Sequence, residues 1–224
     1  MKRPDPMPPV RDTLFGFDPY ENFDPAWAEP DVQGWGHEHG VFEDSIKALQ
    51  PRCIIEVGTW KGASALRMAE ICRAEGLETE IVCVDTWLGP PSIFIHSGKG
   101  DHAAQFNSMR LVNGYPMIYY TFMRNVVDAG AQDMITPLAQ TSENAAKILR
   151  YHKVQADLIY MDAAADKEPV FRDLMFYWPL VRPGGHLVGD DFKHKQVRAG
   201  MEKFCDKTGL TPEVLGGKYR FVKT

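Results

Sequence analysis

The stretch IIEVGTWKGAS, residues 54–64, passes from a mostly apolar run into a segment that contains two glycines. The apolar half is typical of a buried strand, and the residues after Gly62 are typical of a helix. Gly58 and Gly62 permit a tight turn between the two because glycine lacks a Cβ. One acidic residue, Glu56, precedes both glycines. The stretch therefore predicts a strand, a glycine turn and a helix, with a carboxylate near the end of the strand.

The alternation of strand and helix continues on both sides of this stretch. Apolar spacing and end signals predict strands at 52–57, 80–85, 134–140, 157–162 and 184–191, and helices at 41–49, 62–76, 142–152, 168–181 and 196–209. Ser142 is expected to cap the helix at 142–152. The tail 211–224 is expected to form a hairpin that turns at Gly216 and Gly217. The pattern predicts an α/β fold, a Rossmann-like doubly wound and mainly parallel sheet with helices on both faces and a terminal antiparallel hairpin.

Composition divides the chain into an arm and one domain. Residues 1–36 are rich in proline and aromatic residues without periodicity, which indicates an N-terminal arm packed across the domain or onto a second subunit. Residues 37–224 are expected to form the Rossmann-like domain. Residues 88–120 are an insertion after the second strand that would overhang the ligand edge as a lid or substrate wall. The arm or this insertion is equally suited to form a contact in a homo-oligomer.

Charge and cysteine usage limit the class of protein. The 224 residues carry a net charge of −5, and no block of Lys and Arg is large enough to favour nucleic acid. The N-terminus has no apolar leader, and no run is long enough to span a membrane. The cysteines are far apart, which favours a reducing, cytoplasmic setting; they are Cys53, Cys72, Cys83 and Cys205.

The spacing of the opening stretch indicates what kind of ligand it would face. Ligands of open parallel sheets bind beyond the carboxyl ends of the strands, where Glu56 and Gly58 are expected. The spacing E-x-G-x-x-x-G differs from the G-x-G-x-x-G that places a pyrophosphate on a helix N-terminus. A carboxylate would repel a pyrophosphate, so a positively charged ligand fits better. S-adenosylmethionine carries an ammonium and a sulfonium and no phosphate.

A second acid supports a nucleoside ligand. Asp85 ends the next predicted strand, about 20 residues after Gly62, which is the interval at which an acid receives ribose hydroxyls in nucleoside-binding folds. The alternative is that the glycines only mark a loop and that Asp85 only caps a strand end.

Four segments together carry a resemblance to a known family: IIEVGTWKGAS, VCVDTW, DLIYMDAAADKEPVFRDL and LVRPGGHLVGDDF. Over roughly residues 35–224 the chain resembles the class I S-adenosylmethionine-dependent methyltransferases. It is most similar to the small bacterial metal-dependent O-methyltransferases, which include macrolide-sugar and catechol-type enzymes. The resemblance implies methyl transfer from S-adenosylmethionine to a hydroxyl of a small-molecule acceptor.

The resemblance also implies which residues contact the cofactor. Glu56, Gly58 and Gly62 would line its methionine part, and Asp85 would hold the ribose. The segment after the strand at 134–140 would border the adenine. The full set of implied contacts is Glu56, Gly58, Thr59, Trp60, Gly62, Asp85, Thr86, Thr141, Ser142 and Asp162.

Three further carboxylates are expected at the same edge. Asp162 ends one predicted strand, and Asp190 and Asp191 end another. Concentrated negative charge needs a cation, and oxygen ligands suit a hard ion such as Mg²⁺. The resemblance agrees, since this triad is similar to the family's divalent-metal ligands. Alternatively, Asp190 and Asp191 cap the next helix and Asp162 is a solvated strand end.

The chain departs from the family at the expected general base. Related sequences commonly carry histidine or lysine at the position of Ala165, and Lys167 lies two residues further on. Neighbouring Asp166, His186 and His194 are more simply surface charge or strand histidines, so the base stays unassigned. Two other functions stay open: a metal-dependent hydroxylase of the cephalosporin-hydroxylase type, whose fold this class shares, and, because of Ala165, a non-catalytic cofactor-binding scaffold.

Overall fold

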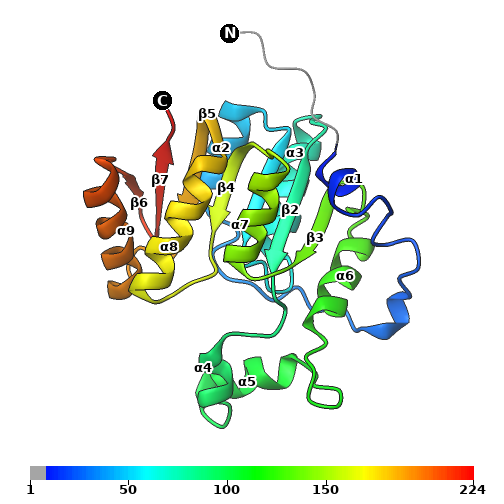
Figure 1. Cartoon of the computed structure of the whole chain (residues 1–224). Coiled ribbons are helices and arrows are strands. Elements are labelled where there is room, and N and C mark those ends of the chain that lie inside the picture. Colours follow the sequence, from blue (N-terminus) through cyan, green and yellow to red (C-terminus); the bar gives the residue numbers. More distant parts are fainter. Residues whose placement is uncertain (1–8) are drawn as a thin grey trace.

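The computed structural model describes residues 9–224, so the first eight residues of the predicted arm lie outside the described part. One sheet of seven strands has the order β3-β2-β1-β4-β5-β7-β6 (Figure 1). Its strands are β1 (Cys53–Val57), β2 (Glu80–Asp85), β3 (Ile135–Ala139), β4 (Ala156–Met161), β5 (Val181–Gly189), β6 (Glu213–Leu215) and β7 (Lys218–Val222). β1 to β5 pair in parallel, and β7 is antiparallel to β5 and β6. The predicted Rossmann-like sheet with a terminal hairpin is confirmed.

Helices cover both faces of the sheet. α2 (Val41–Leu49), α3 (Ala63–Ala74) and α6 (Ile118–Asp128) pack on one face, and α7 (Ser142–Tyr151), α8 (Lys167–Tyr177) and α9 (Lys195–Thr208) pack on the other. Successive strand residues point to opposite faces, so Ile54 joins the first hydrophobic cluster and Ile55 the second. The apolar side chains of β1 therefore lie on both faces of the sheet.

Three local features differ from the sequence-based expectations. Thr141, not Ser142, is the N-cap of α7, because its side chain accepts a hydrogen bond from the Asn144 N–H at 3.2 Å. β5 begins at Val181 and includes the segment that reads as a turn, with Gly184 at a φ of +79°. The sequence analysis also missed α6, which starts inside the predicted insertion. Its first residues, IYYTF, have the β-branched and aromatic composition of a strand.

The arm packs across its own domain. α1 (Val10–Leu14) lies against the β3 edge, where the backbone N–H groups of Val10 and Arg11 donate to the Glu80 carboxylate. A short 3₁₀ helix, η1 (Pro25–Trp27), follows. Further along the arm, Asp31 contacts Lys61 with an Oδ2 to Nζ distance of 2.5 Å. Because the Lys61 side chain is fully buried, this ion pair ties the arm to the loop that follows β1.

The insertion forms helices that extend past the sheet. α4 (Pro91–Ile95) and α5 (Gly100–Ser108) lie beyond the carboxyl ends of the parallel strands (Figure 1). Ile93 and Met109 anchor this segment in the first hydrophobic cluster, whereas Phe94 and Ile95 are exposed. Over residues 9–224, none of the helices has the length and apolar character needed to cross a bilayer.

Candidate functional site

The glycine turn after β1 brings two backbone segments into close contact. Gly58 has a φ of +87°, and a Cβ built on it would lie 2.6 Å from the Ala163 Cα and against the Asp162 carbonyl. The Asp162 N–H donates to the Val57 carbonyl at 2.8 Å. Gly62 has a φ of +91° and faces the Phe122 ring. The predicted turn is therefore present, and only glycine allows it to approach the end of β4 so closely.

Glu56 lies beneath this turn and is fully buried. Its carboxylate accepts hydrogen bonds from the hydroxyls of Thr59 and Ser64, and the Cys83 Sγ lies 3.6 Å away. Burial raises the pKa of Glu56 to about 7, although the hydrogen bonds from Ser64 and Thr59 oppose the shift. Glu56 therefore joins β1, the turn and α3, and the side chain is enclosed by protein on all sides.

Asp85 ends β2 and connects the loops that follow β1 and β2. One carboxylate oxygen accepts the backbone N–H groups of Thr59 at 3.0 Å and Trp60 at 2.8 Å, and the other accepts that of Trp87 at 2.8 Å. Burial raises the pKa of Asp85, and the N–H groups of Trp60 and Trp87 lower it. The backbone N–H of Thr86 lowers the pKa of Asp85 as well, so four N–H groups from the two loops stabilise this carboxylate.

Two tryptophans stand beside Asp85 in an uncommon backbone conformation. Trp60 and Trp87 both have a φ of +51°, in the left-handed region that bulky residues rarely adopt. The Trp87 indole N–H donates to the Trp60 carbonyl at 2.8 Å, which holds the two loops together. Strained backbone of this kind collects at functional sites. Thr86, between Asp85 and Trp87, accepts a hydrogen bond from the Leu88 N–H at 3.3 Å.

The segment after β3 lies next to the end of β2. The Gln140 N–H donates to the Asp85 carbonyl at 3.0 Å, which places Thr141 and Ser142 on the same edge. The Thr141 side chain is exposed, apart from its bond to the start of α7. The Ser142 hydroxyl donates to the Asp173 carboxylate at 2.6 Å. Of the two residues predicted to border an adenine, Ser142 therefore has its hydroxyl committed to α8.

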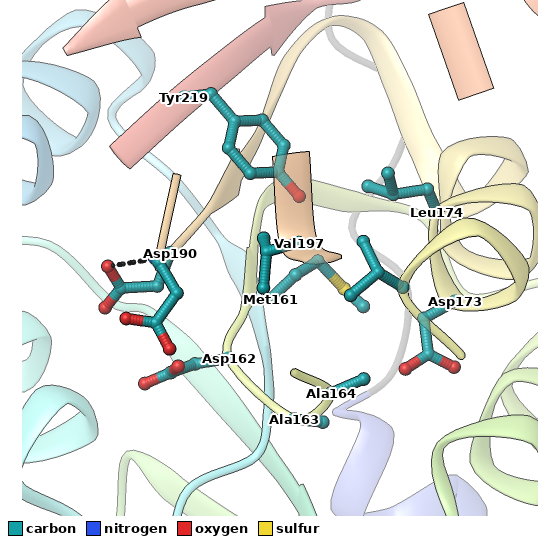
Figure 2. A pocket seen from close by; sticks show the side chains of 11 residues that line it. Met161, Asp162, Ala163, Ala164, Asp173, Leu174, Asp190, Val197 and Tyr219 are labelled. Atoms are coloured by element: carbon teal, nitrogen blue, oxygen red, sulfur yellow. Dashed lines mark hydrogen bonds between the residues drawn. The ribbon is translucent and has the colours of Figure 1, made fainter. Parts of the chain in front are cut away.

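The ends of β4 and β5 supply the acidic part of the site. Asp162 and Asp190 line one pocket, with Asp173 on its opposite side (Figure 2). The Tyr160 hydroxyl lies 2.6 Å from Asp190 Oδ2 and 3.3 Å from Asp162 Oδ2, so the two carboxylates meet at one phenol. The remaining lining residues are Met161, Ala163, Ala164, Val170, Leu174, Asp191, Val197 and Tyr219. The structure thus brings the three predicted metal ligands to the same edge.

A buried lysine that the sequence analysis missed completes this cluster. The Lys218 ammonium lies 2.5 Å from Asp190 Oδ2 and 2.8 Å from the Tyr160 hydroxyl, and the Lys218 side chain is 2% exposed. β7 is antiparallel, so its first residue lies at the edge where the parallel strands end. No local pattern signals this role, because a lysine beside a hairpin turn is usually on the surface.

The contacts of Asp190 bear on the predicted magnesium site. Its Oδ2 accepts from Lys218 and Tyr160, and its Oδ1 accepts the Asp191 N–H at 2.7 Å. In the part of the chain that the structure covers, no three His, Cys, Asp or Glu side chains are grouped to hold a metal ion. A divalent ion needs several free oxygen ligands, so the residues as arranged do not fit it.

The structure also locates the candidates for a general base. Ala165 lies in the exposed loop between β4 and α8, and Lys167 is the exposed first residue of α8. His186 is buried within β5 beside the Ser45 hydroxyl, and burial lowers its pKa to about 4. Asp173 was not predicted. Burial raises its pKa to about 6, and its carboxyl lines the pocket.

Comparisons with known proteins agree with this geometry. The family model described as "Methyltransferase domain" matches residues 55–192, which is more than half of the chain. Comparison with curated protein sequences finds no match.

Three solved structures illustrate the shared fold. An O-methyltransferase from Bacillus cereus in complex with SAH has a TM-score of 0.56 at 16% identity, covering 87% of this chain and 84% of that one. The O-methyltransferase NovP has a TM-score of 0.59 at 16% identity, with coverages of 82% and 78%. TomG from Streptomyces achromogenes, involved in tomaymycin synthesis and solved with SAM, has a TM-score of 0.57 at 15% identity, with coverages of 87% and 83%.

At these identities the likeness to solved structures shows a common fold, and the family match goes further. It spans the glycine turn, Asp85, Asp162 and Asp190, which are the residues that the structure gathers at one edge of the sheet. The resemblance found in the sequence is confirmed, and the chain belongs to the methyltransferase-domain family, with the fold of the class I S-adenosylmethionine-dependent methyltransferases.

Proposed function

We propose that this protein transfers a methyl group from S-adenosylmethionine to a hydroxyl of a small molecule. The observation that carries the proposal is the arrangement around Asp85, whose carboxylate fixes the glycine turn at the carboxyl edge of the sheet, where a ribose would bind. Two of the similar structures, solved with SAH and with SAM, support the choice of cofactor.

The proposed reaction is a direct displacement at the methyl carbon. The acceptor oxygen forms a bond to the methyl carbon, the carbon–sulfur bond breaks, and its electron pair goes to sulfur. S-adenosylmethionine thereby becomes S-adenosylhomocysteine, and the proton of the acceptor hydroxyl passes to solvent water, because no side chain is assigned as the base. Such a step depends mainly on alignment of the two reactants. The rigid loops around Trp60 and Trp87 would hold the donor in place.

The acceptor would enter beside the acidic end of β4. Asp162 is exposed there and lines the pocket with Asp190. α4 and α5 extend past the same edge of the sheet, which supports a role for the insertion as a substrate wall. An open hollow near it is lined by Trp27, Met117 and Tyr120 and offers aromatic surface.

The contacts of the site bear on two finer parts of the sequence-based prediction, magnesium dependence and the general base. Magnesium dependence has no support from the contacts of Asp190, so the proposed reaction contains no metal step. The base position is Ala165, whose methyl side chain cannot accept a proton. This residue favours the second candidate function, a scaffold that binds the cofactor without turnover.

The test combines a binding and a turnover measurement. Titration calorimetry with S-adenosylhomocysteine measures cofactor binding, and transfer of a labelled methyl group to a panel of catechols, phenols and sugars measures activity. Both are repeated with Mg²⁺ and with EDTA. Binding with turnover supports the proposal, and binding without turnover on the whole panel favours the scaffold. If S-adenosylhomocysteine does not bind, both ideas fail and the hydroxylase alternative is tested next.

A further inference from the structure

The ion pair between Lys218 and Asp190 is set by the register of the sheet. Gly189 pairs with Tyr219 at the last antiparallel position of β5 and β7, so Asp190, which follows Gly189, and Lys218, which precedes Tyr219, lie opposite each other at this end of the sheet. Their contact of 2.5 Å follows from this register. A fixed backbone relationship of this kind holds the lysine head at the acidic edge.

The ammonium is enclosed on every side that the structure describes. It lies 5.2 Å from the centre of the Phe42 ring and 4.7 Å from that of Tyr160, in the range of cation–π contacts. The arm closes over the pair, because a Cβ on Gly36 would lie 3.1 Å from the Lys218 Nζ and 3.3 Å from Asp190 Oδ2. Lys218 is therefore a buried residue of the site and not a surface lysine close to it.

We propose that the Lys218 ammonium is the resident cation of the acidic edge, in the place where a divalent metal ion would otherwise neutralise Asp162 and Asp190. A metal ion was expected because the clustered carboxylates need a cation. The Lys218 ammonium already supplies that positive charge. It also donates to Asp190 Oδ2, while Oδ1 accepts the Asp191 N–H, so both oxygens that a metal would need are already in use. A second cation bound there would be repelled by the first.

The inference assigns Lys218 a positioning role. Lys218 donates to the Tyr160 hydroxyl, and Tyr160 donates to Asp190, so one chain of hydrogen bonds orients the carboxylate at the pocket. Methyl transfer that persists in EDTA is the catalytic consequence, and this clause alone rests on the proposed function.

The test measures binding of Mn²⁺, whose electron paramagnetic resonance signal reports the free ion. Wild-type protein, Lys218→Met and Asp190→Asn are titrated with Mn²⁺ after removal of trace metals. We expect no saturable Mn²⁺ site in the wild type. Lys218→Met should gain a saturable Mn²⁺ site, with a Kd at least roughly tenfold below the lower limit that the wild-type titration sets, because a like charge has been removed. The double variant Lys218→Met/Asp190→Asn should lose this gain.

A matched control removes a lysine from an exposed ion pair. Lys203 pairs with Glu168 on the surface, and Lys203→Met should leave Mn²⁺ binding at the wild-type level. Circular dichroism confirms that each variant is folded, and Lys218→Gln replaces Lys218→Met if the latter is not.

Two results would overturn the inference. One is a tight Mn²⁺ site in the wild type that Asp190→Asn removes, and this needs no Lys218 variant. The other is a folded Lys218 variant whose Mn²⁺ binding does not increase. Neither readout requires turnover, so a failure of the proposed methyl transfer would leave this test unaffected.

Discussion

The Trp60 backbone N–H donates to the Asp85 carboxylate across 2.8 Å, so the residue that ends β2 also fixes the loop that follows β1. The same carboxylate accepts the N–H of Trp87 from its own loop. Asp85 is thus both a structural connector and the acid expected to receive the ribose. Changing it should affect the shape of the cofactor site as well as its chemistry.

Asp85→Ala should weaken S-adenosylhomocysteine binding about 10- to 100-fold. The variant removes a charged acceptor for a ribose hydroxyl, worth about 1.5–3 kcal/mol, and loosens the loop that carries Trp60. Titration calorimetry measures the change in Kd. Asp206→Ala, which alters an exposed acid in α9, should bind like the wild type. An unchanged Kd for Asp85→Ala would refute the ribose role.

Glu56→Gln should change how stability depends on pH. The pKa of Glu56 is about 7 in the folded protein and 4.5 as the ordinary value, so the folded state holds the proton more tightly. Stability from this group is complete below pH 4.5 and is lost as the pH rises to 7, a fall of about 3 kcal/mol. Gln cannot ionise, so the variant should lack this fall.

Urea unfolding of the wild type and of Glu56→Gln, at several pH values from about 5 to 8, checks this expectation. The informative quantity is the difference between the two unfolding free energies, because Asp173 titrates in the same range in both proteins. A difference that stays constant with pH would show that Glu56 is ionised throughout.

Gly58→Ala should destabilise the protein by more than about 2 kcal/mol. Its φ of +87° is unfavourable for alanine, and the new Cβ would press against the backbone of Ala163 at 2.6 Å. Thermal unfolding measures the effect. Gly217→Ala is the control, because no atom lies within 4 Å of its Cβ position, and it should stay within about 0.5 kcal/mol of the wild type. Equal melting temperatures for the two variants would contradict the close contact between the turn and β4.

Ala165→His should raise the rate of methyl transfer by roughly 100-fold or more, if the reaction is limited by the missing base. Residue 165 is exposed, so the larger side chain should be tolerated. Release of S-adenosylhomocysteine with an accepted substrate measures the rate. Lys167→Ala should leave the rate unchanged, and a loss would identify Lys167 as the base. A His variant that binds the cofactor and never turns over would favour the scaffold.

Much of the framework could be predicted from the sequence because a parallel sheet is buried on both faces. β2 and β4 are therefore mostly apolar runs, and Asp85 and Asp162 mark their ends. α6 was missed because its aromatic, β-branched start resembles a strand. Burial of Phe122 and Met123 against the core makes it a helix. Here tertiary packing outweighs local propensity.

The sequence by itself determined the alternation of strands and helices, apart from the helices of the arm and the insertion, and the acids at the carboxyl edge, because hydrophobic periodicity and glycine turns are local properties of the chain. Only the tertiary structure decided how the charge of those acids is balanced. Lys218 reaches Asp190 through an antiparallel pairing between β5 and β7, and Lys61 reaches Asp31 through the path of the arm. Both contacts join residues far apart in the chain, and such partners are fixed by strand register and burial, which no local pattern encodes.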